Sequence, residues 1–288
     1  IGADGKAAWV KSFGGSGIDE LYGLAVDGAG DVYIAGSFAS TSVTFEVARS
    51  LGTASSAPFV AKLAGGTGAA LKSVTFHKGS DGGSCNSIAA RAGVIAVGCT
   101  MAGTAQVTMS SGGTNDVDPP GTGTGILLAE LDPTSLGAFW ANGLGSTAGE
   151  YLAGVDVTPA GDLVFAAQSG NNGDIALTDT LGSVNVVIRR SPTTVVGRLA
   201  KSSGLASWAK AYGTNEQGRG IAPNGIAADA DANIVFCGDL KGTVDVGGTS
   251  ISQIVPNSEL ASMAVVKRGA NGTTIAARAL GGTSDEYV

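Results

Sequence analysis

The sequence predicts an all-β protein, and three observations carry this prediction. Glycine accounts for 47 of the 288 residues and charged residues for only 14%, so the chain is rich in turns and poor in solvated helix faces. Hydrophobic residues reach 43%, which provides a real core and excludes a disordered glycine-rich tail. No stretch carries a sustained 3.6-residue hydrophobic period, whereas short alternating segments between turn residues are typical of β-hairpins.

Internal repeats are the main signal in the chain. One marker is a large apolar residue that steps by 63, 68, 68 and 68 residues, at Phe13, Phe76, Leu144, Tyr212 and Leu280. A second marker steps by 68 and 68 residues, at Lys62, Glu130 and Arg198. The repeats are expected to span approximately residues 1–76, 77–144, 145–212 and 213–280, with 281–288 beginning a fifth repeat.

Each repeat contains two predicted hairpins. In the first repeat, residues 21–38 alternate apolar and polar side chains on both sides of a turn at 27–31, and the equivalent turns are 158–162 and 229–233. A second hairpin joins residues 59–63 to 71–76, after a Ser/Thr/Gly-rich excursion over 39–57.

Four strands per repeat, arranged head to tail, predict a β-propeller built of four four-stranded blades of about 68 residues, plus the start of a fifth repeat. A solenoid requires shorter rungs, and tandem immunoglobulin-like domains require larger modules. Residues 1–288 are therefore expected to form a single β-propeller or a segment of a larger one.

The segment GGSGIDELYGLAVDGAGDVYIAGSF (14–38), followed by PFVAKL (58–63), resembles the bacterial SBBP repeat. This repeat is a predicted seven-bladed β-propeller repeat that is distantly similar to NHL-type repeats. The resemblance covers all four copies and is strongest in the first and fourth. It implies a propeller fold and a secreted or surface-attached bacterial protein, and it implies no reaction. The longer excursions depart from the shortest family repeats, so the blade number is not carried over.

The charge balance and the histidine content exclude several functions. With 17 basic and 24 acidic residues the net charge is −7, and the closest basic pairs, Arg189-Arg190 and Lys267-Arg268, are isolated. A nucleic-acid partner needs a clustered basic surface, so none is expected. No apolar run reaches the roughly 18 residues of a membrane span. The single histidine, His77, is expected in a solvated loop, which leaves little room for histidine-based catalysis.

Several motifs suggest ligand sites, and ordinary turns explain them better. Asp229, Asp231 and Asn233 have the D-x-D-x-N spacing of a calcium loop but align with the hairpin turns of the other repeats, so calcium is only a weak candidate. Residues 14–22 match a calcium-binding nonapeptide once, without the tandem copies that this motif needs. The glycine run at 121–125 lacks the Lys-Ser/Thr of a phosphate loop. Asn271-Gly272 is expected to form a hairpin turn.

The three cysteines predict one disulfide and one free thiol. Cys85 and Cys99 flank a hairpin that folds back about Ala92, so they are expected to lie opposite each other, within reach of a disulfide bond. Such a bond indicates an oxidising compartment. Cys237 corresponds to Ala35 of the first repeat and is expected to be a buried free thiol.

The function predicted from the sequence is that of a non-catalytic, extracellular binding or adhesion module for protein or glycan partners at the bacterial surface. No residue is assigned a catalytic or cofactor-binding role. The tryptophans occupy one repeated strand position, which favours packing over sugar stacking. An alternative is a structural subunit of an extracellular layer or filament. A hydrolase or lyase fits less well, because a nucleophile needs a neighbouring base and a glycosidase needs two carboxylates at a set separation.

The two ends of the sequence predict an open ring. Four inner hairpins are accompanied by five outer-type strands, which start at Trp9, Lys72, Trp140, Trp208 and Ala276. A four-bladed ring would leave one of them unpaired, and an open β edge favours association. Further blades in the same chain, or homo-assembly with other copies, are therefore expected.

Overall fold

The computed structural model consists of strands, turns and irregular segments, and the all-β prediction is confirmed. The structure describes residues 5–120, 123–146, 149–169, 175–177, 186–188, 190–214, 216, 218–255 and 260–282. These residues form 24 strands and no helix. Residues 283–288, at the expected start of a fifth repeat, lie outside the described part.

The larger strands form four antiparallel units of four strands, which we call the first to fourth sheets. The first sheet contains β1 (Asp19–Val26), β2 (Val32–Phe38), β5 (Ala57–Leu63) and β6 (Ala70–Thr75). The second contains β7 (Gly83–Arg91), β8 (Val94–Met101), β11 (Gly125–Leu131) and β12 (Ala138–Leu144). The third contains β13 (Glu150–Val157), β14 (Leu163–Ser169), β17 (Arg190–Leu199) and β18 (Ala206–Thr214). The fourth contains β19 (Gly220–Ala228), β20 (Ile234–Lys241), β23 (Ser262–Arg268) and β24 (Thr274–Leu280).

Each sheet has the same strand order along the chain, and the predicted hairpins β1–β2 and β5–β6 are found where expected. One residue pair, Gly213 and Gly220, links β18 to β19 and joins the third and fourth sheets at one edge.

The excursions between the second and third strands of the sheets contain small hairpins that the sequence did not predict. These hairpins are β3 (Ser42–Thr44) with β4 (Ala48–Ser50), β9 (Ala105–Thr108) with β10 (Thr114–Val117), β15 (Ile175–Leu177) with β16 (Val186–Ile188), and β21 (Thr243–Asp245) with β22 (Ser250–Ser252). Val43, Val107 and Val244 are buried at the centres of three of them. Strands of three or four residues are too short to show a clear alternating pattern, which is why the composition alone suggested loops.

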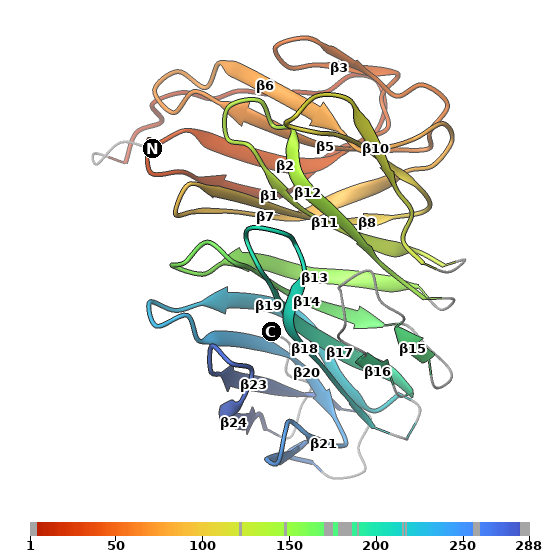
Figure 1. The fold of residues 1–288 in the computed structure, drawn as a ribbon, viewed down its shortest axis with the longest axis vertical. Helices are drawn as coiled ribbons and strands as arrows, with labels where there is room; N and C mark the ends of the chain where they lie inside the picture. The colour runs from red at the N-terminus through yellow and green to blue at the C-terminus, as the bar shows by residue number, and fades with distance from the viewer. Residues whose placement is uncertain are drawn as a thin grey trace.

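The four sheets follow one another from the top to the bottom of Figure 1. Their first strands, β1, β7, β13 and β19, pack successively against one another, and a separate apolar core fills each junction between neighbouring sheets. Every residue of β11 is buried because the second sheet has a neighbour on both faces. The strands β20 and β23 alternate buried and half-buried residues because the fourth sheet has a neighbour on one face only.

The first strand of every sheet carries a β-bulge near its middle. In the second sheet this bulge affects the predicted disulfide. Ala92 and Gly93 both have positive φ in a two-residue turn, so the hairpin centre lies between them rather than at Ala92. The bulge at Asn86 shifts the pairing and brings Cys85 opposite Cys99, where the structure contains the buried disulfide.

A tryptophan of one sheet seats on a turn glycine of the next sheet. The Trp140 indole N–H donates to the Lys201 carbonyl oxygen (2.9 Å), and a Cβ atom on Gly204 would lie 2.5 Å from the ring. Trp208 repeats this arrangement, with a 3.0 Å hydrogen bond to Ala270 and its ring against Gly272. Both glycines have positive φ and lie under an aromatic ring, so no other residue fits without movement. The packing role expected for the tryptophans is confirmed.

The same turn position recurs at a spacing of 68 residues, at Gly68, Leu136, Gly204 and Gly272. The exception is Leu136, which keeps the positive φ (59°) although it is not glycine, and its side chain is buried. The first-sheet residue at the tryptophan position is Lys72, which lies opposite Lys62 as Trp140 lies opposite Glu130. At this junction, where no indole ring is present, the turn residue can carry the buried aliphatic side chain of Leu136 in place of a glycine.

The outer-type strand expected to start at Trp9 is not formed, because residues 5–18 contain no strand. The side chains of this segment nevertheless make the repeated contacts. Trp9 donates to the Gly65 carbonyl oxygen (2.7 Å) with its ring against Gly68, and the Phe13 ring lies 5.2 Å from that of Phe45. No strand in the described part of the chain pairs with this segment, which is held on the first sheet by these side-chain contacts and by hydrogen bonds of Gly17 and Ile18 to residues just after β2.

The first and fourth sheets each leave part of one face free, and no pair of their described strands packs closely together. On the first sheet this free part is β1, because side chains of the segment 9–13 and of the β3–β4 excursion cover β2 and β5. On β1, Leu21, Leu24 and Val26 are 61%, 67% and 50% exposed. The equivalent residues of β13, Leu152, Val155 and Val157, are buried against the second sheet.

Cys237, on the free face of the fourth sheet, is a free thiol as expected, but it is partly exposed rather than buried. The expected burial was wrong because no sheet covers this face in the described structure.

We predict that Trp208→Ala lowers the free energy of unfolding by about 3–5 kcal/mol, because it removes a buried ring and opens a cavity between two sheets. Urea denaturation measures the change. Trp9→Ala is the matched control: it removes the same indole-to-carbonyl bond from a segment that belongs to no sheet, and it should cost less than half as much. Equal losses in the two variants would contradict the prediction.

Candidate functional site

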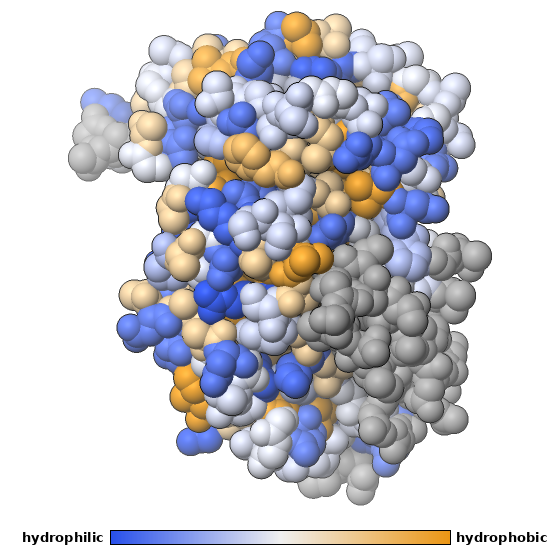
Figure 2. Space-filling view, in the orientation of Figure 1, coloured by the Kyte–Doolittle hydropathy of each residue, from blue (hydrophilic) through white to orange (hydrophobic). Residues whose placement is uncertain are grey.

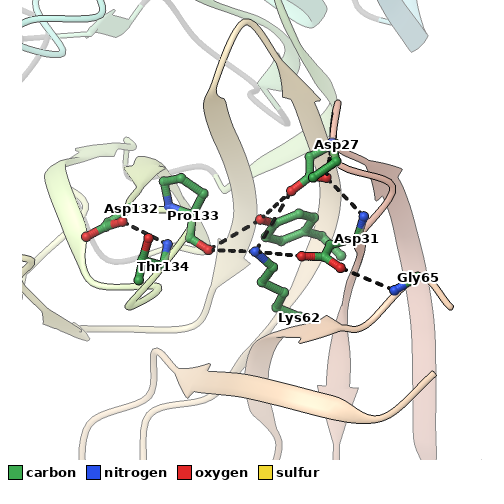
Figure 3. Close-up of polar contacts among 9 residues, drawn as sticks. Asp27, Asp31, Lys62, Gly65, Asp132, Pro133 and Thr134 are labelled. Atoms are coloured by element: carbon green, nitrogen blue, oxygen red, sulfur yellow. Dashed lines mark hydrogen bonds and ion pairs between the residues drawn. The ribbon is translucent and has the colours of Figure 1, made fainter. Parts of the chain in front are cut away.

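A cation on the third strand of the first sheet bridges that sheet to the next one, as Figure 3 shows. The Lys62 ammonium lies 3.0 Å from Asp31 and 3.9 Å from Asp27, the two aspartates of the β1–β2 turn. It also donates to the Pro133 carbonyl oxygen, 3.1 Å away in the β11–β12 turn of the second sheet. Burial lowers the pKa of Lys62, but hydrogen bonds to Tyr33 and Asp31 outweigh it and hold the pKa above its usual value.

The junction between the third and fourth sheets has the same construction. The Arg198 guanidinium donates to Asp162 from Nε (2.9 Å) and from Nη2 (2.7 Å), and its Nη1 donates to the Ala270 carbonyl oxygen (3.1 Å) of the β23–β24 turn. We call this arrangement the inter-sheet bridge: a third-strand cation paired with a turn aspartate of its own sheet and bonded to a turn carbonyl of the next.

The junction between the second and third sheets lacks this bridge, because Glu130 occupies the position of the cation. Glu130 is only 3% exposed and forms no ion pair with a described residue. One of its carboxylate oxygens accepts a hydrogen bond from the Trp140 indole (3.0 Å), and the other has no hydrogen-bond partner in the described structure. Burial raises the pKa of Glu130, although the Trp140 hydrogen bond and the Lys201 charge oppose the rise.

A hollow of about 460 Å³ opens at this junction, and we call it the Glu130 pocket. The second sheet contributes Glu130 and Phe139, and the third sheet contributes its two turns, with Asp162, Ala200, Lys201 and Ser202. The Phe139 side chain is 52% exposed. A bridging lysine or arginine would extend into this space and donate to a turn carbonyl, whereas the shorter glutamate cannot donate and leaves the space open.

The charges around the Glu130 pocket are nearly balanced. Arg198 donates twice to one oxygen of Asp162, and the other oxygen accepts from the Lys201 backbone N–H (3.0 Å). Glu130 is therefore the carboxylate with a free oxygen, in a concave site with an aromatic wall. Such a combination of apolar lining and few polar groups is typical of small-molecule sites. On the face drawn in Figure 2, hydrophobic residues are scattered among polar ones rather than gathered into one patch.

The weak calcium candidates Asp229, Asp231 and Asn233 lie in the β19–β20 turn of the fourth sheet. One Asp229 oxygen accepts the backbone N–H groups of Asp231 and Asn233, and the other lies 2.8 Å from the Lys267 ammonium. Asp27 bonds its own turn in the same way in the first sheet. A calcium ion would have to displace the lysine, and the calcium hypothesis stays a prediction.

The other sequence motifs have structural roles where the structure describes them. In the nonapeptide-like segment, Asp19 accepts hydrogen bonds from Gly15 and Ser40 and thereby closes a loop. Asn271-Gly272 forms the expected turn. Of the glycine run, residues 121 and 122 lie outside the described part, and Gly125 begins β11.

His77 is not a solvated loop residue, contrary to expectation, because it forms an isolated β-bridge with Ala105. Its Nδ1 is buried without a partner in the described structure, and burial lowers the pKa of the ring.

Glu130 appeared in the sequence only as a marker of the 68-residue period. Two signals could have revealed its role. At a position where the other repeats carry Lys62 and Arg198, the charge is reversed. The β7–β8 turn is also shortened to Ala92-Gly93 and has no aspartate to pair with a cation.

The chain matches no protein-family model and none of the curated proteins. The described part contains no helix long and apolar enough to cross a membrane. It also contains no group of three or more His, Cys, Asp and Glu side chains that could hold a metal ion. The geometry of the Glu130 pocket is therefore the main guide to function.

We predict that Glu130→Gln becomes progressively more stable than the wild type as the pH rises above about 4.5. A carboxyl group whose pKa is raised by folding stabilises the fold at low pH, and this contribution is lost as the pH rises through the folded-state pKa. Glutamine keeps an acceptor for Trp140 and carries no charge.

Thermal unfolding between pH 4 and pH 8 measures this difference, and Glu46→Gln is the matched control. Burial acts to raise the pKa of Glu46, but hydrogen bonds from Ser73 and Arg49 outweigh it and lower the pKa. This variant should therefore lose stability relative to the wild type over the same range. A Glu130→Gln curve parallel to that of the wild type would refute the prediction.

Proposed function

We infer that the four sheets are successive blades of a β-propeller, built of units that resemble SBBP repeats. The common strand order, the side-by-side first strands and the repeated tryptophan contact support this interpretation. Radial repetition of four-stranded antiparallel sheets is the defining feature of propellers. The two free faces fit a propeller segment rather than a closed ring of four blades.

The function that the geometry supports best is a non-catalytic binding or adhesion module for a protein or glycan partner at the bacterial surface. The observation that carries it is the Glu130 pocket, where an otherwise repeated inter-sheet bridge is replaced by an open, partly apolar hollow. A rigid repeat scaffold with one modified junction suits recognition.

Two further observations agree with this proposal. Hydrolysis of a glycan needs two carboxylates available to the substrate, and Asp162 is already held by Arg198. The buried disulfide between Cys85 and Cys99 supports an extracellular or cell-surface location, since disulfides persist in oxidising compartments.

A structural subunit of an extracellular layer or filament is a second candidate, and the exposed face of β1 favours it. Leu21, Leu24 and Val26 occupy positions that a neighbouring sheet buries elsewhere in the chain. Contact of this face with the free face of another copy would be head-to-tail, which produces rings or filaments.

Surface plasmon resonance of the immobilised chain against soluble glycans and purified bacterial surface proteins tests the first proposal. We expect saturable, reversible binding and an unchanged partner mass. Cleavage of the partner would contradict the non-catalytic role. Ordered self-assembly in analytical ultracentrifugation, abolished by Leu24→Asp and accompanied by no partner binding, would replace the binding module with the structural subunit.

A further inference from the structure

The Glu130 pocket contains a polar group that lacks a partner in the described structure. Glu130 is only 3% exposed, and one of its carboxylate oxygens accepts the Trp140 indole N–H. The other oxygen has no protein donor in the described structure and is not among its fully buried unpaired atoms, so it is accessible to a donor in the pocket. A ligand with a hydroxyl or an N–H group would supply the missing hydrogen bond from within the pocket.

The surrounding charges favour a neutral ligand. The Glu130 and Asp162 carboxylates are matched by the Lys201 ammonium and the Arg198 guanidinium in and beside the pocket. A charged ligand of either sign would meet two like charges as well as two opposite ones, so it would gain little net electrostatic attraction. A ligand that bonds through hydroxyl groups meets no such repulsion.

The shape and the aromatic wall favour a ring with one apolar face. Phe139 offers an exposed phenyl ring beside the carboxylate, while Ser202 adds a hydroxyl on the opposite sheet. The positions equivalent to Phe139 in the other sheets, Leu71, Ser207 and Ile275, are not aromatic. A volume of about 460 Å³ is in the lower part of the range for small-molecule pockets, so the ligand is small.

We propose that the Glu130 pocket binds a neutral saccharide of one or two pyranose rings, with a sugar hydroxyl donating to Glu130 and a C–H face of the ring on Phe139. This proposal rests on the binding function proposed above and assigns it a ligand class and a place. It also explains why the inter-sheet bridge is missing at this junction only, among the three junctions between described sheets.

Isothermal titration calorimetry of the full chain tests the proposal with glucose, galactose, mannose, N-acetylglucosamine, cellobiose and maltose as probes. We expect at least one to bind. Phe139→Ala and Glu130→Lys should each weaken binding at least tenfold, since the lysine would donate to the Lys201 carbonyl as Lys62 does to Pro133 and fill the pocket. Leu71→Ala, at the position equivalent to Phe139 in the first sheet, is the matched control and should leave the affinity unchanged.

Other outcomes separate this proposal from the binding function itself. Sugar binding that Phe139→Ala leaves unchanged would overturn the site, and the binding function would stand. Preferential binding of cadaverine or inorganic phosphate would overturn the ligand class. Binding of a surface protein without any sugar binding would also overturn the saccharide proposal, while absence of every partner would remove the binding function too. If Glu130→Lys fails to fold, two other tests remain. Ser202→Ala should weaken sugar binding, and the sugar should quench the tryptophan fluorescence of the wild type.

Discussion

The arrangement of the sheets depends on one contact, in which an indole ring of one sheet seats on a positive-φ turn residue of the next. The ring occupies the space that a side chain on Gly204 or Gly272 would need, and its N–H donates a hydrogen bond to a carbonyl of the same turn. The contact therefore fixes both the distance and the offset between neighbouring sheets. Leu136 agrees with this constraint. It is the one residue with a side chain at this turn position among the described sheets, and it lies where Lys72 replaces the indole that would need the space.

Because the sheets share one strand order and one turn geometry, the three junctions can be compared position by position, and differences between them become informative. Two junctions add a bridge from Lys62 or Arg198 to the next turn, and the remaining one places a buried carboxylate there. The loss of the bridge opens space without separating the sheets, because the Trp140 contact is retained and its N–H is shared with Glu130. A pocket can thus open between repeated sheets when one residue at a repeated position differs.

The periodic features of this fold could be predicted from the sequence, and the features that depend on neighbouring sheets could not. Alternation and turn residues located the hairpins, and symmetry about Ala92 found the Cys85–Cys99 pair even though a bulge lies between them. The strand expected at Trp9 and the burial expected for Cys237 both failed, since each requires an adjacent sheet that the described structure lacks. In the sequence, Glu130 appears only as one of the residues that recur every 68 positions. Its burial and its lack of an ion pair depend on how the second and third sheets pack together, which the sequence does not show.

A double-mutant cycle at the junction between the first and second sheets tests most directly whether the ring-on-turn contact governs the packing. Lys72→Trp alone places a ring against Leu136, and Leu136→Gly alone empties a buried site. The combined variant recreates the arrangement of Trp140 on Gly204. Urea denaturation should show that the double variant is more stable than the sum of the single changes by at least about 1 kcal/mol. Strictly additive effects would show that the indole and the turn glycine act independently, and would contradict the account.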